Sequence, residues 1–399
     1  MKRSTDRILT THSGSLIRTR EIIEGMKART IGRPYDRDTL DAAIRDGVQQ
    51  VVRQQVEAGI DVVNDGEFGK PTDTTNDADH GHGVWAMYVR ERLTGFEVLE
   101  AEKRSPASKD RTAFATFYGT GARRQPAESG RAGEVGRRTR VLSCTGPISY
   151  CGQQIVERDI ANLRAALDGA DPGGAFLPAV SPGSLPSLIP DHHHADEDAY
   201  RQALAEALRE EYLAIARAGF LLQIDDPVLV AAWDWWPDDD RDAYRATAAR
   251  DVELLNQALR GIPAEQIRYH LCWGSWQGPH RSDLPLADVA DLMLSIRAGA
   301  YVVEAANPRH EHEWRLWRDV ALPGDALLIP GVVTHKTSVV EHPEVVADRI
   351  VRYAEVVGRE RVIAGTDCGV GGRISSDVAW AKLDTLVEGA RIATDRLWT

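Results

Sequence analysis

IRYHLCWG, residues 267–274, is a short run of β-branched and aromatic residues that contains two metal-binding side chains. In a β-strand, side chains two positions apart point to the same face, so His270 and Cys272 are predicted to face one side together. The later runs VVEAAN and VIAGTDCG bring Glu304 and Cys368 to the ends of two further strands. A parallel barrel gathers such ends on one face. Two sulfurs, one imidazole and one carboxylate can fill a tetrahedral zinc shell, so a zinc site is predicted there.

The alternative is that all four cysteines are small buried hydrophobic residues, and this is the prediction for Cys144 and Cys151. For Cys272 and Cys368 a metal role is favoured. In TDCGVGGR, three glycines follow Cys368 within four residues, and burial alone does not require them. In a cytosolic chain with few cysteines, metal binding or catalysis is a more frequent use of cysteine than a disulfide.

Strand and helix patterns alternate along the rest of the chain. The segment 38–58 places apolar residues close to the 3.6-residue helical repeat, and helices are also predicted over 198–218 and 379–394. Eight strands are predicted, over residues 8–16, 59–67, 141–149, 220–230, 267–274, 302–307, 327–335 and 362–369. This alternation predicts an α/β fold, a single (β/α)8 TIM barrel that spans residues 1–399. The competing doubly wound sheet would carry a G-x-G-x-x-G loop after its first strand, and HSGSL does not match it.

Two stretches interrupt the alternation. Residues 70–138 are long and polar and include VWAMYVRERLTGFEVLE, which predicts a helix or hairpin, and residues 170–197 are dense in proline and glycine. Within the second stretch, AFLPAV at 175–180 is predicted to be an extended loop because of its proline. The consecutive histidines 192–194 are predicted to be solvated, with a second metal tract as the alternative. Since both stretches follow predicted strands, they are expected on the C-terminal face of the barrel as lids or substrate walls.

Charge and apolar content limit the partners of the chain. A net charge of −12 argues against nucleic acid and against an anionic membrane surface, because phosphate binding needs a basic face. The N-terminal sequence MKRSTDRILTTHSGSL lacks the apolar run of a signal peptide, and no segment approaches the roughly 20 apolar residues that span a bilayer. A cytoplasmic enzyme with reduced thiols is expected, and whether it is a homo-oligomer stays open.

Seven motifs in order carry a resemblance to a known family: THSGSL, DVVNDGE, LQIDDP, YHLC, VVEAANPRHEHEW, PGVVTH and TDCG. They resemble the catalytic domain of cobalamin-independent methionine synthase, and more closely its single-barrel relatives, which include epoxyalkane:coenzyme M transferase. The resemblance covers residues 8–398 apart from the two insertions. It implies a TIM barrel of the methionine synthase/uroporphyrinogen decarboxylase-like type with one zinc ion, which binds a substrate thiol as a thiolate.

Residue by residue, the resemblance assigns three groups of side chains. The zinc ligands of the family fall on His270, Cys272, Glu304 and Cys368. The residues that hold the amino acid part of homocysteine fall on Ser15, Glu67 and Asp225. The catalytic histidine of the family falls on His335 after a shift of one residue.

Each substrate-binding or catalytic candidate also has a structural interpretation. Glu67 and Asp225 can accept hydrogen bonds from a substrate ammonium or from backbone N–H groups of the next loop. The first role is favoured, because polar loop residues on a rigid scaffold often carry function. Ser15 can be a turn residue, and His335 can be a hydrogen-bonded wall residue rather than a proton donor. The candidates for the wall of the pocket, with core packing as the alternative, are Trp273, Trp276 and His12.

The leading prediction is a zinc-dependent S-methyltransferase that activates a small thiol as a zinc thiolate for attack on a methyl donor. By resemblance, the thiol is homocysteine and the product is methionine, and the donor is a methylated folate or a methylated corrinoid protein. The N-terminal barrel of the long enzymes has no counterpart in this sequence, which leaves the donor open. One alternative is zinc-dependent alkyl transfer to another thiol, as in the ring opening of an epoxide by an epoxyalkane:coenzyme M transferase. Another is a metal-free lyase of the uroporphyrinogen decarboxylase type.

Overall fold

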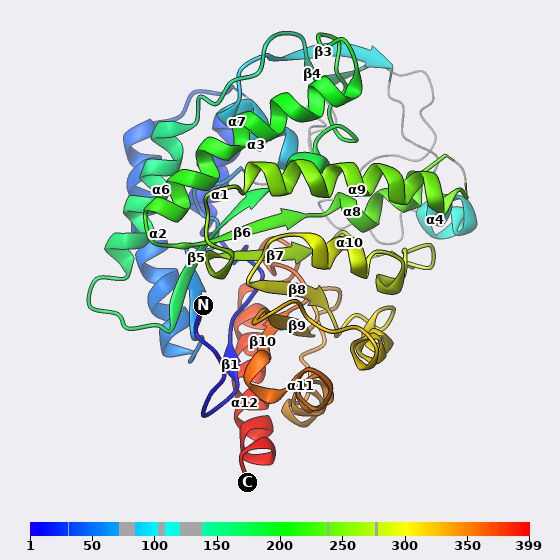
Figure 1. The fold of residues 1–399 in the computed structure, drawn as a ribbon. Helices are drawn as coiled ribbons and strands as arrows, with labels where there is room; N and C mark the ends of the chain where they lie inside the picture. The colour runs from blue at the N-terminus through cyan, green and yellow to red at the C-terminus, as the bar shows by residue number, and fades with distance from the viewer. Residues whose placement is uncertain (31, 72–83, 103–107, 120–137, 238, 276–277) are drawn as a thin grey trace.

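The central feature of the computed structural model is a barrel of parallel strands, surrounded by helices (Figure 1). The structure describes all residues except 31, 72–83, 103–107, 120–137, 238 and 276–277. Within the described residues, eight strands follow the order β1-β10-β9-β8-β7-β6-β5-β2. A parallel bridge between Thr11 and Val62 joins the two edge strands, so the sheet closes on itself. The predicted TIM barrel is therefore confirmed.

The strands of the barrel are short. They are β1 Leu9–Thr10, β2 Val62–Asn64, β5 Gly174–Val180, β6 Leu221–Asp226, β7 Ile267–Leu271, β8 Ala300–Glu304, β9 Leu327–Val333 and β10 Ile363–Thr366. All except β5 overlap a strand that the sequence predicts. Because the strands are parallel, their carboxyl ends gather at one mouth of the barrel.

The outer layer is helical, and the three helices predicted from the sequence correspond to α2, α7 and α12. The helices outside the first insertion are α1 Arg20–Thr30, α2 Arg37–Glu57, α6 Gln153–Ala166, α7 Glu197–Arg217, α8 Val228–Ala231, α9 Arg241–Ala258, α10 Ala290–Ser295, α11 Pro343–Val357 and α12 Ser376–Leu397. Aspartates begin three of them, since Asp36, Asp196 and Asp240 each accept a hydrogen bond from the backbone N–H three residues later. No helix among the described residues is long and apolar enough to cross a membrane.

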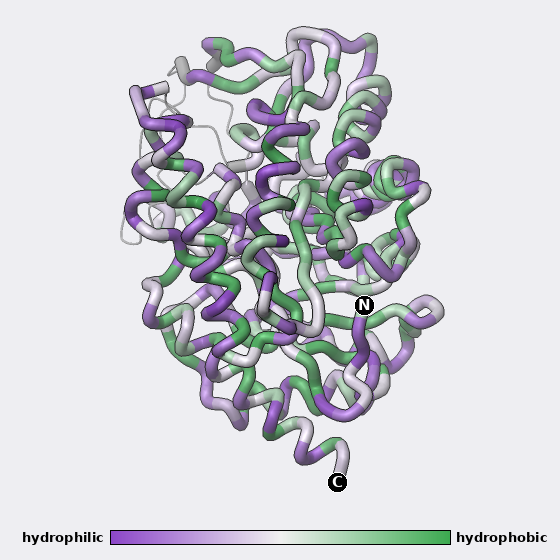
Figure 2. Tube along the Cα trace, turned by 90° about the vertical axis from the view of Figure 1, so that its left-hand side faces the viewer, coloured by the Kyte–Doolittle hydropathy of each residue, from purple (hydrophilic) through white to green (hydrophobic). Residues whose placement is uncertain are grey.

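Alternation along the strands separates the barrel interior from the surrounding layer. On β8, Val302 belongs to an apolar cluster with Leu9 and Ile329 from other strands. Its neighbours Tyr301 and Val303 belong to the large cluster that includes the helices. Hydrophilic and hydrophobic residues alternate along the outer helices (Figure 2). The helices therefore cover one face of the closed sheet with their apolar sides and leave the other face to fill the barrel.

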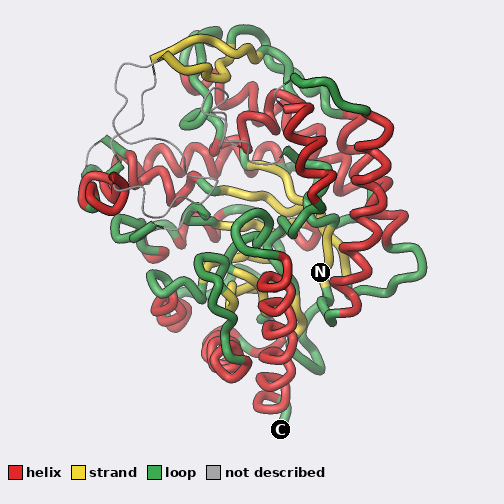
Figure 3. Tube along the Cα trace, turned by 180° about the vertical axis from the view of Figure 1, so that it is seen from behind, coloured by secondary structure: helices red, strands yellow, loops and turns green. Residues whose placement is uncertain are grey.

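The prediction of a barrel strand over 141–149 is wrong. The first part of this segment belongs to β4 Arg138–Cys144, which pairs antiparallel with β3 Phe96–Glu102. The two strands form a hairpin apart from the barrel (Figure 3). The short helices of the same insertion are α3 Val84–Arg92, α4 Lys109–Ala113 and α5 Ala115–Gly119. An alternating strand sequence does not reveal its partner, because strand propensity depends on tertiary packing.

The prediction of a loop at AFLPAV, 175–180, is also wrong, because this segment is the barrel strand β5. The stretch 170–197 is therefore only in part an insertion. The pairing of β5 with β2 ends at Phe176, so Pro178 lies beyond the last β2 partner, and its carbonyl accepts a hydrogen bond from Lys70 Nζ. A proline is tolerated in a strand at a position where no neighbouring strand needs a hydrogen bond from its backbone nitrogen.

Candidate metal centre

Three of the four predicted metal ligands come together at the C-terminal mouth of the barrel. His270 lies in β7, Cys272 follows this strand, and Cys368 follows β10. One ligand atom from each residue lies within 4.8 Å of the other two, and the two sulfur atoms are 3.8 Å apart. Since β7 and β10 are not neighbours in the sheet, this contact crosses the mouth. All three side chains are buried. Two sulfurs and one imidazole in this arrangement fit zinc.

The alternation of β7 explains why two of these residues point into the barrel. Arg268, His270 and Cys272 are two positions apart and share one face of the strand. Arg268 is fully buried, and its guanidinium donates across the barrel to the carbonyl of His12 at 2.9 Å. His270 and Cys272 are further along the same face and therefore lie above this contact, in the mouth.

His270 is held by a carboxylate from the neighbouring strand. Asp225 on β6 is in register with His270, and its Oδ1 lies 2.9 Å from His270 Nδ1. Burial lowers the pKa of His270, but the hydrogen bond and the charge of Asp225 outweigh burial and raise this pKa to about 9. A carboxylate on one ring nitrogen leaves the other nitrogen for a metal, which is the usual surrounding of a metal-bound histidine.

A hydrogen bond joins the two sulfur atoms. Cys272 donates a hydrogen bond to Cys368, and this bond lowers the pKa of Cys368 to about 6 in spite of burial. The positive charges of Arg373 and His270 act in the same direction. The same bond raises the pKa of Cys272 well above its usual value. A thiolate is therefore stabilised at Cys368, and the thiolate is the form of cysteine that binds metals.

Glu304, the fourth predicted ligand, ends β8 but is not in the group of three. Its carboxylate accepts hydrogen bonds from the backbone N–H of Trp273 at 3.3 Å and from Asn307 Nδ2 at 2.8 Å. Its charge raises the pKa of both cysteines, so it lies within electrostatic reach of the sulfurs. Each of its oxygens accepts one of these bonds and keeps a lone pair for a metal, but no oxygen of Glu304 belongs to the set of donor atoms within 4.8 Å of one another. Its role as a ligand therefore stays a prediction.

Two polar residues of the site are missing from the sequence-based prediction. Asp367 Oδ1 accepts hydrogen bonds from the backbone N–H groups of Ala305 and Ala306 at 2.8 and 2.9 Å, which ties the end of β10 to the end of β8. Gln223 donates to Asp225 Oδ1 at 2.7 Å. The two-residue period of β6 could have identified Gln223, because it shares a face with Asp225. The position of Asp367 in TDCG does not reveal its partners.

Glu67 and Asp225, two of the three predicted substrate-binding residues, place their carboxylates near each other at the mouth of the barrel. A Cβ atom placed on Gly14 would lie 2.2 Å from Oε1 of Glu67 and 3.8 Å from Nε2 of Gln223. This amide group of Gln223 donates a hydrogen bond to Asp225. Burial raises the pKa of Glu67, and the charge of Asp225 adds to this shift while Lys70 opposes it. Two neighbouring carboxylates of this kind favour a cation between them.

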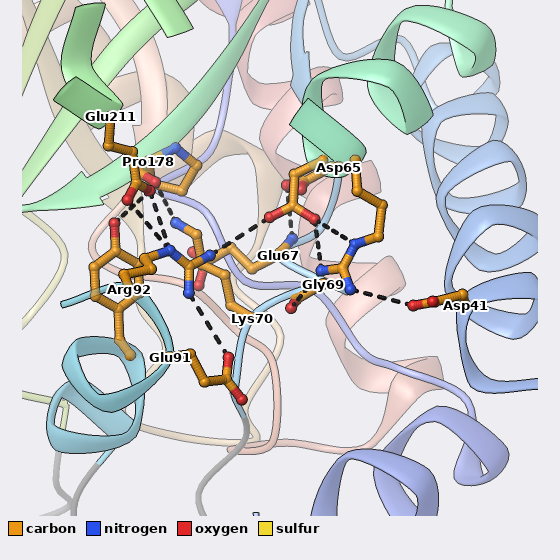
Figure 4. A network of polar contacts seen from close by, with 12 residues as sticks. Asp41, Asp65, Glu67, Gly69, Lys70, Glu91, Arg92, Pro178 and Glu211 are labelled. Carbon is orange, nitrogen blue, oxygen red and sulfur yellow. Dashed lines mark hydrogen bonds and ion pairs between the residues drawn. The ribbon is translucent and has the colours of Figure 1, made fainter. Parts of the chain in front are cut away.

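The loop that carries Glu67 is held in a strained conformation. Glu67 has a φ of 61°, which costs a non-glycine residue about 1–3 kcal/mol unless its surroundings hold it. Arg18 donates to the carbonyl of Glu67 at 2.5 Å, and Arg158 donates to that of Gly69 at 3.1 Å. The side chain of Lys70 donates a hydrogen bond to the carbonyl of Pro178 on β5 (Figure 4). Three cations therefore fix the backbone of this loop, and strain held in this way is typical of a functional site.

Ser15, the third predicted substrate-binding residue, lies against the loop that carries Cys368. The backbone carbonyl of Ser15 accepts hydrogen bonds from the N–H groups of Val370 and Gly371, both at 2.9 Å. A Cβ atom at Gly369 would lie 2.3 Å from Ser15 Oγ. The glycine after Cys368 is therefore required for this close approach, which accounts for part of the glycine-rich sequence.

His335, the predicted catalytic residue, follows β9 and is fully buried. Neither of its ring nitrogens has a hydrogen-bond partner among the described residues. Burial lowers its pKa well below the usual value, and the charges of Lys336 and Arg373 add to the effect. The ring is therefore neutral at pH 7, and its two nitrogens lack the hydrogen-bond partners that buried polar atoms usually have, which favours a role toward a ligand.

The residues predicted to form the pocket wall have other surroundings. Trp273 is fully buried, and its ring packs on His310 at a centroid distance of 4.1 Å. His12 is also buried, and its ring nitrogens contact Gln55 Oε1 at 2.8 Å and a backbone N–H at 3.3 Å. The structure therefore places both in the core. Trp276 lies outside the described residues.

The fold and this site define a TIM-barrel enzyme with a cluster of soft donor atoms at its mouth. The family of the cobalamin-independent synthase catalytic domain matches residues 186–392, and the chain belongs to this family. The resemblance predicted from the motifs is therefore confirmed.

Individual relatives are distant but match over nearly the whole length. The chain is 22% identical to a 2-hydroxypropyl-CoM lyase of Xanthobacter autotrophicus, over 90% of this chain and 87% of the relative. It is 23% identical to a methionine synthase of Thermococcus kodakarensis, over 96% of this chain and 93% of the relative. The structure of a B12-independent methionine synthase from Shewanella sp. W3-18-1 in complex with selenomethionine matches with a TM-score of 0.72. The two are 19% identical over 98% of this chain and 99% of that one, so the match supports the shared fold.

Proposed function

We propose that this enzyme transfers a methyl or another alkyl group to the sulfur of a small thiol, with zinc as its metal and homocysteine as the thiol. The approach of His270, Cys272 and Cys368 within 4.8 Å supports this most directly. These residues would hold the ion, with Glu304 as the fourth ligand. Zinc bound there would lower the pKa of a substrate thiol and keep its sulfur nucleophilic. Two thiolates and a carboxylate exceed the charge of the ion, which favours a reactive sulfur over an activated water.

The carboxylates at the mouth support homocysteine over a thiol without an amine. Glu67 and Asp225 can accept hydrogen bonds from the ammonium group of an amino acid. Coenzyme M carries a sulfonate instead, which two carboxylates would repel. Ser15, which lies against the loop of Cys368, would bind the other end of the amino acid backbone.

We propose that His335 acts on the second substrate. Its neutral ring can donate one N–H hydrogen bond to the leaving part of the donor molecule. To pass a proton as well, the ring must first take one up, because only the imidazolium form is a proton donor at neutral pH. A methylated folate or a methylated corrinoid protein would be the donor. The likeness to the 2-hydroxypropyl-CoM lyase supports a second candidate function, in which an epoxide is the electrophile and another thiol is the acceptor. A metal-free lyase has less support, because Cys272 and Cys368 would have no function in such an enzyme.

X-ray absorption at the zinc edge tests the central claim. The purified protein is expected to contain zinc with two sulfur neighbours, and addition of homocysteine is expected to bring a third sulfur into the coordination shell. The same measurement with methionine serves as the control, because a thioether has no proton to lose. A protein without zinc, or a shell that homocysteine leaves unchanged, contradicts the proposal.

Glu67→Gln separates the two candidate functions. The variant keeps the shape of the side chain and removes its charge. If the thiol is homocysteine, the KM for homocysteine is expected to rise about 10- to 100-fold, the cost of one charge-assisted hydrogen bond. Steady-state kinetics with homocysteine and with 2-mercaptoethanesulfonate measure this. An unchanged KM for homocysteine, together with use of the sulfonate thiol, favours the alkyl transfer to a thiol without an amine.

A further inference from the structure

A second group of metal-binding side chains lies where the hairpin meets the loop before α7. Cys144 ends β4, and Asp191 and His194 belong to that loop. One ligand atom from each of the three lies within 4.8 Å of the other two. None of these residues is shared with the barrel mouth, and β4 lies outside the barrel (Figure 1).

The geometry of this group is that of a chelate rather than of a proton relay. His194 Nδ1 lies 3.0 Å from Asp191 Oδ1 and 3.9 Å from Cys144 Sγ. In a nucleophile relay, the acid and the thiol would face different ring nitrogens. Here a single nitrogen, Nδ1 of His194, faces both the carboxylate of Asp191 and the thiol of Cys144. Zinc bonds of about 2.0–2.3 Å in a tetrahedron place donor atoms roughly 3.3–3.8 Å apart, so only small shifts would close the shell.

The backbone holds the three donors in place without a metal. Cys144 forms a parallel bridge with Asp191. The N–H of Cys144 donates to the carbonyl of Pro190, and its carbonyl accepts from the N–H of His192, both at 2.9 Å. The Asp191 carboxylate accepts from the backbone N–H groups of His193 and His194 at 3.2 and 3.1 Å. A site fixed in this way loses little conformational entropy when an ion binds.

The chemistry of the donors and their exposure suit zinc. A thiolate and a carboxylate together balance the charge of a divalent cation, and imidazole completes a set that zinc prefers. Cys144 is fully buried. The side chains of Asp191 and His194 are 16% and 13% exposed, which leaves a path for the ion and a place for one water.

We propose that Cys144, Asp191 and His194 bind one structural zinc ion, which fastens the β3–β4 hairpin to the chain leading into α7. The ion would link the end of β4, which contributes Cys144, to the loop between β5 and α7, which contributes Asp191 and His194. Its task is to stabilise this part of the fold, and it has no role in the transfer reaction.

Zinc content of the full chain tests this proposal. The wild-type protein, equilibrated with zinc and then freed of loose metal, is expected to hold about two ions per chain, one at each site. His194→Asn is expected to lose about one ion and to expose the hairpin to proteases. His193→Asn is the matched control, since this neighbouring histidine is exposed and outside the group. It is expected to keep the wild-type content.

Variants of the barrel mouth keep the two proposals separate. In a Cys272→Ser/Cys368→Ser background, one ion is expected to remain, and His194→Asn should remove it. With cobalt in place of zinc, this background should still show a sulfur-to-cobalt absorption band, and Cys144→Ser should abolish it. Zinc content that His194→Asn leaves at the wild-type level overturns the second site, whatever the barrel mouth binds. Loss of zinc from the barrel variants alone bears only on the proposed function.

Discussion

Replacing Cys368 with alanine is expected to abolish alkyl transfer and to release zinc from the barrel mouth. In the proposed site, Cys368 would supply one of the two sulfur ligands, and it lies 3.8 Å from Cys272 across the mouth. Loss of a partner that only supports a metal ligand typically costs 10–100-fold in metal affinity, so loss of the ligand itself should cost at least about 100-fold. Zinc content after dialysis and the rate of transfer to homocysteine measure the two effects. Cys272→Ser is expected to behave in the same way.

Cys151→Ala is the matched control for this prediction. Cys151 is exposed, so the prediction that it is a buried residue is wrong. It belongs to neither group of metal-binding residues, and its loss should leave zinc content and transfer unchanged. Chelation of the wild-type protein should reproduce the defect of Cys368→Ala, and added zinc should reverse it. A zinc-free Cys368→Ala protein that still transfers the alkyl group at the wild-type rate would rule out the thiolate mechanism.

The sequence predicts the metal centre better than its surroundings, for a physical reason. His270 and Cys272 could be paired from the two-residue strand period, and parallel strands then bring Cys368 to the same mouth. The hydrogen bond that Asp225 accepts from His270 depends on the register of β6 and β7. Register is a tertiary property, and neither residue type nor spacing reveals it. The role of Asp225 beside the histidine was therefore not predictable.

The fold shows the same division between local and tertiary information. Helices α2 and α7 follow from an apolar repeat and an aspartate cap, both of which are local signals. The sequence misplaces the third barrel strand, because Pro178 argues against a strand at 175–180, and VLSCTGPIS, residues 141–149, has the pattern of one. Whether a neighbouring strand would need a hydrogen bond from the nitrogen of Pro178 depends on where β2 ends. Whether β4 joins the barrel depends on the presence of β3 beside it.

Glu211→Ala is expected to destabilise the folded protein by about 3–5 kcal/mol, because it removes the nearest of the carboxylates that pair with a buried arginine and leaves two buried tyrosine hydroxyls without an acceptor. Glu211 on α7 accepts hydrogen bonds from the hydroxyl groups of Tyr88 and Tyr150 at 2.5 and 3.0 Å. It also forms an ion pair with Arg92 at 3.2 Å. Arg92 is fully buried, and Figure 4 shows it between acidic residues of the barrel layer and of the insertion. The network therefore joins α3 to α7.

The free energy of unfolding in urea measures this loss, and Glu210→Ala is the matched control, since that neighbouring carboxylate is exposed. The double variant Glu211→Leu/Arg92→Met is expected to recover most of the stability, because replacing both members of a buried ion pair by apolar groups is often neutral. Recovery would show that the cost lies in the charge of Arg92 that Glu211 no longer balances. If Glu211→Ala instead unfolds at the same urea concentration as the wild-type protein, the buried pair does not hold the insertion on the barrel.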